Sequence, residues 1–385
     1  MVRGLRRPWK MAVYYDFDVE ATFEFVKKII VHIEEAGGRV MAATCDMGNQ
    51  SFLGPKGVNL LSKGNHSFPN PARPNAMVWV IPDQVHMIKV RRILTNTHAC
   101  QSLFTFQLFR NHIWTHGLLY KDGDVEAELN ISHFKQAIGV TGEIKLNHKF
   151  GLSHLNAKKN ELQRVYLAVQ SLNDSMSCKF KLMGLEVQAM ILRIIDRWFH
   201  VCDSRTRNHS KSFKAALGTN LEEQLKHLED MIQLMGKIQF KGGHVTKPFQ
   251  KGIVAGCKSI MALYEDLRAN GQDFLCTYLL NQDALELHFS LIRSLVTHPR
   301  AAQFVSCFRA LFFSSHTPNI LEDNTPVSEA KDIWEPTWNK GLEMVVEVED
   351  SNCPFLDVED ELLLEEQPGE IQAVAGWISY KVIMS

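Results

Sequence analysis

The stretch around which the rest of the chain is organised is NQDALELHFSLIR, residues 281–293. Apolar residues recur in it at helical spacing and predict an amphipathic helix: Leu285, Phe289 and Ile292. We expect Asp283 to be the N-cap, because an aspartate carboxylate accepts a backbone N–H of the first turn. Glu286 lies one turn further on. The same pattern is also typical of an ordinary surface helix whose acidic first turn suits the helix dipole.

A second stretch, RVMAATCDMGN at residues 39–49, is an apolar run that ends in Asp46. It predicts a buried strand with a carboxylate at its carboxyl end, which is where ligands bind in open α/β sheets. A strand-end Asp46 and a helix-borne Glu286 are the kind of hard oxygen ligands that two-metal phosphoryl-transfer enzymes use for Mg²⁺. The simpler alternative for Asp46 is a cap of the turn after the strand.

The first hundred residues alternate strand and helix patterns, which predicts a parallel or mixed α/β layer. Strands are expected at residues 11–17, 39–46 and 76–81. Between the first two, a helix is expected to start with Asp18 as its cap and to stop at the glycine pair 37–38. The run at 76–81 is almost wholly apolar, so it predicts a strand that is buried on both faces.

From about residue 100 to residue 270 the strand signals fade and helical periodicity dominates. The clearest periodic runs are at residues 162–172, 187–198 and 221–235. Because strand and helix patterns flank this region, it predicts a mainly α-helical insertion in an α/β chain. The acidic stretch at residues 321–370 has little apolar periodicity and is expected to be a disordered linker.

Composition excludes several classes of protein. The 42 basic and 43 acidic residues give a net charge of −1, so any contact with nucleic acid must come from a local patch. None of the eight cysteines forms a Cys-x-x-Cys pair, which argues against a zinc finger and favours free buried thiols. No apolar run is long enough to cross a bilayer, and the first residues have no signal-peptide core. We therefore expect a soluble intracellular protein without a membrane partner.

The chain resembles P element-type DNA transposases and the THAP-type proteins derived from them. No single block of sequence is specific for that family, but the order and spacing of the blocks over nearly the whole chain are. These blocks are Trp9–Asp18, Thr44–Gly48, Pro82–Lys89, Pro248–Gly252, Leu263–Leu267, Asn281–Glu286 and Val374–Trp377. The zinc-based THAP module has no counterpart in this sequence.

The resemblance implies an RNase H-like α/β core, incomplete in this chain, that is interrupted by a mainly α-helical GTP-binding insertion domain. The implied regions are an N-terminal part of the core at residues 1–100, the insertion at 101–270, a C-terminal part of the core at 271–320, the acidic linker at 321–370 and a fragment of the transposase C-terminal region at 371–385.

The catalytic triad of the family is Asp, Asp and Glu. By resemblance, Asp46 is the second member and Glu286 the third, and both are expected to be catalytic residues and Mg²⁺ ligands. No residue before Asp16 is acidic, so the first member has no counterpart in this chain. In two-metal catalysis one carboxylate often bridges both ions, and its loss is expected to remove most of the activity.

For GTP, the sequence contains no Gly-x-x-x-x-Gly-Lys-Ser/Thr loop, which excludes a P-loop. The resemblance implies a different pocket, and the residues that match its nucleotide contacts are Lys145, Lys159, Asn160, Asp203 and Asp283. A lysine suits phosphates, and an aspartate suits the N–H donors of guanine or Mg²⁺. Cys202 stands where relatives carry an aromatic residue that stacks on the base. For each of these positions, an ordinary surface residue without a ligand is as consistent with the sequence as a nucleotide contact.

The resemblance thus implies cut-and-paste DNA transposition that depends on Mg²⁺, with GTP as a structural cofactor. The expected partners are transposon ends, target DNA and GTP, and the nucleus is the expected location. A homo-oligomer is an open alternative to a monomer, because the sequence does not give the oligomeric state. The alternative is a catalytically inactive relic or domesticated protein that binds nucleotide or other partners.

Overall fold

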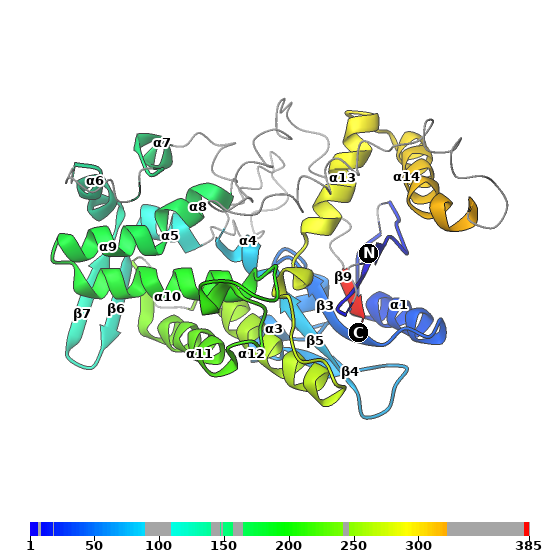
Figure 1. The fold of residues 1–385 in the computed structure, drawn as a ribbon, viewed down its shortest axis with the longest axis horizontal. Helices are drawn as coiled ribbons and strands as arrows, with labels where there is room; N and C mark the ends of the chain where they lie inside the picture. The colour runs from blue at the N-terminus through cyan, green and yellow to red at the C-terminus, as the bar shows by residue number, and fades with distance from the viewer. Residues whose placement is uncertain are drawn as a thin grey trace. The chain divides into compact units, whose positions relative to one another are not determined.

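In a computed structural model, the described residues are 1–6, 9–17, 19–88, 109–139, 147, 149–156, 165–241, 246–321 and 381–384. They form two compact units that are considered separately. The first unit is Met1–Val13, Val19–Gln282 and Ile378–Ser385; the second is Tyr14–Asp18 and Asp283–Trp377. The fold is a mixed α/β fold with two sheets and many helices (Figure 1).

The larger sheet has six strands in the order β2-β1-β9-β3-β5-β4. Their bounds are β1 Val2–Gly4, β2 Lys10–Met11, β3 Val40–Cys45, β4 Ser67–Pro69, β5 Met77–Pro82 and β9 Lys381–Met384. β3 and β5 are parallel, whereas β3 pairs with β9 and β5 pairs with β4 in antiparallel fashion. The sheet is therefore mixed, as the alternating strand and helix patterns predict.

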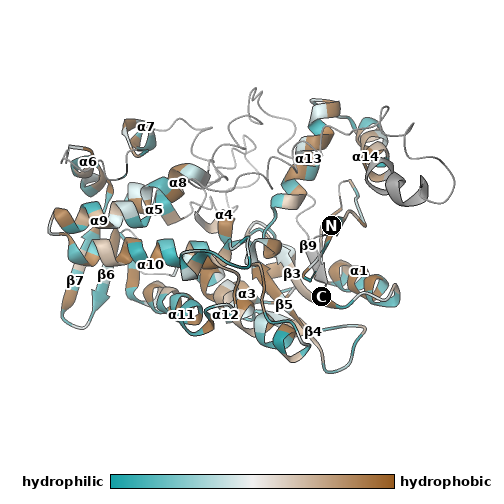
Figure 2. Cartoon of the chain, viewed as in Figure 1, coloured by the Kyte–Doolittle hydropathy of each residue, from teal (hydrophilic) through white to brown (hydrophobic). Residues whose placement is uncertain are grey.

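The strands predicted at 39–46 and 76–81 are confirmed as β3 and β5. Every residue of β3 is buried, and most of β5 is buried as well. Figure 2 shows the same strands coloured mainly as hydrophobic. Uniformly apolar strands fit because helix α12 (Pro248–Ala269) covers β5, with the Ser259 hydroxyl donating to the Val80 carbonyl at 2.7 Å.

The strand predicted at residues 11–17 is largely wrong. Only the first of these residues is in a strand, as the end of β2. The aromatic side chains that suggested a strand pack in the second unit instead: Tyr15 lies 4.6 Å from Phe308 and Phe17 lies 5.5 Å from Phe304, between ring centroids. Aromatic residues favour strands because they fit a half-buried pleated surface, and here Tyr15 and Phe17 find a comparable surface on a helix.

The first helix is confirmed, but its cap is not the predicted one. Helix α1 spans Phe23–Glu35, and Thr22 is its N-cap, with its hydroxyl accepting from the Phe25 N–H at 3.3 Å. The predicted cap, Asp18, lies outside the described residues. The helix ends where expected, since Gly37 follows it with φ of +87°, a conformation that favours glycine.

The other helices of the first unit include the three predicted from periodic runs, here α8, α10 and α11. Their bounds are α2 Gln50–Leu53, α3 Leu60–Lys63, α4 Gln84–Ile88, α5 Phe109–His116, α6 Ile131–Gly139, α7 Leu152–Leu155, α8 Val165–Ser171, α9 Asp174–Leu182, α10 Glu186–Cys202 and α11 Leu221–Lys237, with short 3₁₀ turns η2 Ser212–Lys214 and η3 Thr277–Leu280. α10 packs on α9 and α11, and α11 packs on α12.

The expectation that strand signals fade after residue 100 misses a three-stranded antiparallel sheet, β7-β6-β8. β6 (Leu118–Asp122) and β7 (Val125–Leu129) form a hairpin in which Asp122 pairs with Val125, and β8 is Ile238–Phe240. Gly123 takes a φ of +59° in the two-residue turn. A Gly-Asp pair, here Gly123 and Asp124, is a hairpin signal, but the half-exposed strands beside it lack a strong apolar pattern.

In the second unit, the helix predicted from residues 281–293 is confirmed as α13, Asp283–Leu295, followed by α14, Ala301–Leu321. Asp283 is the first residue of α13 and not the cap before it, so the helix starts one position earlier than predicted. On the predicted apolar face Leu285 and Ile292 are buried, and the Phe289 ring lies 6.3 Å from that of Phe304.

The described cysteines are all free, as expected: Cys45, Cys178, Cys202, Cys257, Cys276 and Cys307. Within the described ranges, no helix combines the length and apolar character that crossing a membrane requires. The acidic stretch that follows Leu321, up to residue 370, lies outside those ranges. The proposed five-region division does not coincide with the two compact units, and it stays a prediction.

Candidate functional site at the carboxyl ends of β3 and β5

Asp46 directly follows β3, at the carboxyl end of the strand. Its side chain is partly exposed, and its Oδ1 accepts from the Gly48 N–H at 2.9 Å, which closes a tight turn. A side chain at Gly48 would place its Cβ 3.1 Å from that same oxygen, so glycine leaves room for the carboxylate. The turn therefore orients Asp46 at the strand end without burying it.

Asp83 follows β5, the parallel neighbour of β3, and is completely buried. Its backbone N–H donates to the Cys45 carbonyl at 2.9 Å. One carboxylate oxygen accepts from the Val85 N–H at 3.1 Å, in the first turn of α4. The other accepts from the Gln282 N–H at 2.7 Å. Asp83 therefore joins the end of the sheet to α4 and to the segment before α13.

A second hydrogen bond joins the end of β3 to the segment that precedes α13. The buried Thr44 hydroxyl donates to the Leu280 carbonyl at 3.0 Å. Because Cys45 pairs with Pro82 in parallel register, the two strands end side by side, and both carboxylates lie near Cys45. Burial, and then the negative charges of Asp46 and Asp83, raise the pKa of the Cys45 thiol. Asp83 is not singled out from the sequence, although an aspartate between an apolar run and a helix is the pattern of a cap.

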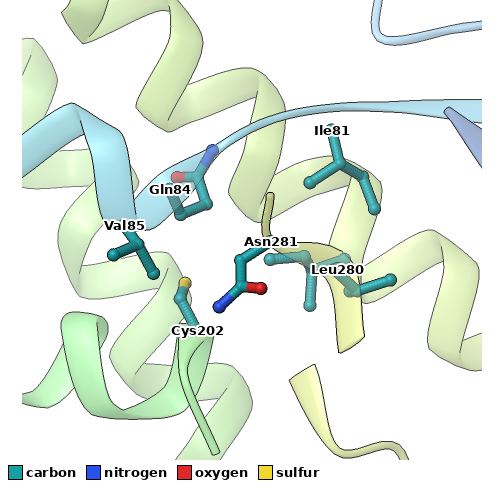
Figure 3. A pocket seen from close by; sticks show the side chains of 7 residues that line it. Ile81, Gln84, Val85, Cys202, Leu280 and Asn281 are labelled. Atoms are coloured by element: carbon teal, nitrogen blue, oxygen red, sulfur yellow. The ribbon is translucent and has the colours of Figure 1, made fainter. Parts of the chain in front are cut away.

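Asp203 is the C-cap of α10 and faces the same segment. The Asn281 side-chain amide lies 3.4 Å from its Oδ1, and the Arg205 guanidinium lies 3.5 Å from its Oδ2. Between them is a small recess (Figure 3), lined by Ile81, Gln84, Val85, Cys202, Ile260, Leu280 and Asn281. It is too narrow to admit a water molecule, so the recess as it stands does not fit a guanine base.

The remaining predicted residues fall elsewhere. Lys145, Lys159 and Asn160 lie outside the described residues. Asp283 and Glu286 are half-buried in the first turn of α13, in the second unit. The pairing of Glu286 with Asp46 and the nucleotide contact of Asp283 stay predictions.

The fit to Mg²⁺ rests on Asp46 alone among the described residues of the first unit. Its partly exposed carboxylate is a hard oxygen ligand of the right chemistry. Both oxygens of Asp83 already accept backbone N–H groups. Over the ranges that the structure describes, no group of three or more His, Cys, Asp or Glu side chains is placed to hold a metal ion.

A polar cluster on α10 was not anticipated from the sequence. Asp196 is buried, and burial followed by the nearby charge of Asp174 raises the pKa of Asp196 to about 6. The His200 Nε2 lies 3.6 Å from the Asp196 Oδ1. The pKa of His200 is well below its ordinary value, first because the ring is buried and then because of nearby cationic groups, Lys214, Lys211, Arg197 and His209.

Comparison with known proteins finds a curated relative and a solved structure that are similar to this chain. No protein-family model matches the chain. A curated relative, the transposable element P transposase of Drosophila melanogaster, is 25% identical over 324 residues, which is 79% of this chain. The match spans 39% of that relative, so this chain corresponds to about two fifths of its length. A solved structure, the Drosophila P element transposase strand transfer complex, matches with a TM-score of 0.69 and 23% identity, and covers 81% of this chain and 68% of the matched one.

The similarity in sequence thus extends over most of the chain, and the similarity in fold extends over the same share of it. The chain is therefore a homologue of the Drosophila P element transposase.

Proposed function

We propose that this chain acts as a P element-type transposase, and that the edge formed by the ends of β3 and β5 belongs to an RNase H-like catalytic core. The observation that carries the proposal is the position of Asp46. It stands at the carboxyl end of a fully buried strand, beside a parallel neighbour, in a chain homologous to a transposase. In open α/β sheets that edge is where ligands bind.

In this proposal Asp46 and Glu286 hold Mg²⁺. When bound by such carboxylates, the ion activates a water and stabilises charge on the leaving oxygen of a phosphodiester. The part of the chain itself is to fix the ligands: the Gly48 N–H orients the Asp46 carboxylate, and Asp83 holds the strand ends to the segment that precedes α13. The substrates are transposon ends and target DNA, and the acting form is a homo-oligomer in the nucleus.

GTP is the second proposed ligand, held by the helical region at residues 101–270. Asp203 supports this part, since its carboxylate faces polar groups at the end of α10. Because the recess beside it is closed, binding of a base requires the Asn281 side chain to move. The other proposed contacts are Lys145, Lys159, Asn160 and Asp283.

A non-catalytic derivative is the second candidate function. It needs no complete catalytic triad, of which Asp46 and Glu286 are the members matched by resemblance. Such a protein retains binding of DNA or nucleotide and does not join DNA strands.

One set of assays separates the candidates. The full chain is titrated with a labelled DNA duplex and assayed for strand transfer with Mg²⁺. Transfer that disappears in Asp46→Asn, but persists in the matched surface variant Asp124→Asn, supports the enzyme. DNA binding without transfer supports the non-catalytic derivative. A chain that neither binds nor joins DNA contradicts both.

Nucleotide binding is tested with a fluorescent GTP analogue. We expect Asp203→Ala and Lys145→Ala each to weaken binding about tenfold or more, because each removes a charge-assisted contact. Asp124→Ala serves as the control. If binding survives both substitutions, the proposed pocket is wrong, and the proposal of a transposase core is unaffected.

A further inference from the structure

The loop between α10 and α11 carries a local concentration of basic side chains. Residues 204–221 contain no Asp or Glu. Within them are five basic side chains: Arg205, Arg207, His209, Lys211 and Lys214. The whole chain has a net charge of −1, so this concentration does not reflect a generally basic protein.

The basic side chains stand on a rigid base. Gln224, completely buried at the start of α11, donates from its amide to the Ser212, Ala215 and Ala216 carbonyls at 3.1, 2.9 and 3.1 Å. Its amide oxygen accepts from the Gly218 N–H at 3.0 Å. These bonds fix the backbone of the loop at residues 212–218 and do not involve the side chains of Arg207 and Lys211.

The charged ends point outward while aromatic rings lie beneath them. Arg207, His209 and Lys211 are exposed. The Arg207 guanidinium carbon lies 4.8 Å from the Phe274 ring centroid, and that of Arg197, on α10, lies 3.7 Å from the buried Phe213 ring. Stacking holds a guanidinium in place without neutralising it, so its donors remain available to an anion.

Acidic groups nearby do not cancel this charge. Asp203 lies 3.5 Å from Arg205, and Asp174 faces Arg193 and Arg197. In the described part of the chain, Arg207 and Lys211 form no ion pair with a carboxylate. Burial chiefly lowers the pKa of His200, and the nearby charges of Lys214 and Lys211 lower it further.

We propose that the loop at residues 205–214 is a contact surface for the phosphate backbone of DNA. This deepens the proposed function, on which it rests for the identity of the polyanion. An exposed loop with spaced cations suits an extended chain of phosphates, since backbone contacts come from Arg, Lys and small hydroxyl side chains and need no enclosed cavity. Thr206, Ser210 and Ser212 lie between the basic residues.

The test uses the full chain and a fluorescein-labelled DNA duplex, with the dissociation constant measured between about 50 and 200 mM salt. In the variant Arg207→Gln/Lys211→Gln we expect binding about tenfold weaker and a salt dependence of log K that is shallower by roughly two, one for each lost phosphate contact. Both side chains are exposed, so the melting temperature should stay within about 2 °C of the parent.

Two matched variants serve as controls. Lys56→Gln/Lys63→Gln removes the same charge from exposed positions near α3 and should leave the affinity and the slope unchanged. Arg207→Lys/Lys211→Arg keeps the charge and should retain both.

The outcomes separate this proposal from the proposed function. If the parent binds the duplex and the loop variant binds it equally well with the same slope, the loop assignment is wrong and DNA binding stands. If the parent binds no duplex even at low salt, the DNA partner itself is contradicted. Binding of polyglutamate at the loop, without binding of the duplex, would assign the loop to an acidic protein and overturn the proposal.

Discussion

Two regions of the first unit bury a carboxylate, and they hold it in opposite ways. At the end of β5, Asp83 is fully buried and both of its oxygens accept backbone N–H groups. In α10, Asp196 is almost as buried, but it faces His200 and the charge of Asp174, and its pKa rises to about 6. Burial of an acid therefore does not by itself indicate a functional site; the groups that hold its charge decide its role.

The largest expected effect comes from removing the satisfied carboxylate. Asp83→Ala leaves two buried backbone N–H groups without an acceptor and should lower the free energy of unfolding by about 3 kcal/mol. Urea denaturation of the full chain measures it, with Asp124→Ala as the exposed control. A loss below about 1 kcal/mol would mean that Asp83 does not hold the strand ends together.

Removing the charge of Asp196 should raise the free energy of unfolding, whereas Asp83→Ala should lower it. A folded-state pKa of about 6, above the ordinary 3.8, means that this carboxyl stabilises the fold below pH 3.8 and that the benefit is lost as pH rises through 6. Asp196→Asn should therefore raise the free energy of unfolding at pH 7.5 by on the order of 2 kcal/mol.

The gain from Asp196→Asn should be smaller at pH 5 than at pH 7.5, because the parent carboxyl is largely protonated in the fold at pH 5. Urea denaturation at both pH values checks this. His200, whose folded pKa is depressed, destabilises the fold as pH falls below 6.5 in both proteins, so the comparison between them largely removes its effect. A variant that is less stable than its parent at pH 7.5 would show that Asp196 is held as a needed charge.

The smallest expected effect on stability is at Asp46. Asp46→Asn keeps an acceptor for the Gly48 N–H on a partly exposed side chain, so the free energy of unfolding should change by no more than about 0.5 kcal/mol. Binding of Mn²⁺, followed by the loss of its free-ion signal in electron paramagnetic resonance, should weaken in this variant and persist in Asp124→Asn. Unchanged Mn²⁺ binding would remove Asp46 from the metal site.

The sequence predicts best where burial is uniform. The apolar runs of β3 and β5 and the periodic stripes of α10 and α11 all lie in the core, and they are confirmed. The hairpin β6–β7 is not predicted because its half-exposed strands mix apolar and charged residues, although Gly123 and Asp124 mark its turn. Residues 11–17 look like a strand because they are rich in aromatic and β-branched residues, and nothing local reveals that Tyr15 and Phe17 pack against a helix.

For the candidate site, the position of Asp46 is predicted from sequence, because an acid directly after a long apolar run marks the end of a buried strand. Asp83 is missed, since its role depends on the Gln282 N–H, a partner 199 positions away. The cluster of Asp196 and His200 is missed for the same reason: the basic groups around His200 come from a loop whose course the sequence does not reveal. Long-range partners decide which polar residue matters, and a single sequence does not display them.

The links from Thr44 to Leu280 and from Asp83 to Gln282 have a consequence for biosynthesis. They span 236 and 199 positions, so neither can form until almost all of the first unit has left the ribosome. At translation rates of about 5–20 residues per second, the Asp83 carboxylate waits roughly 10–40 s for its second donor. During that interval a charged group destined for the interior stays hydrated, and the nascent sheet is open at that edge to chaperones.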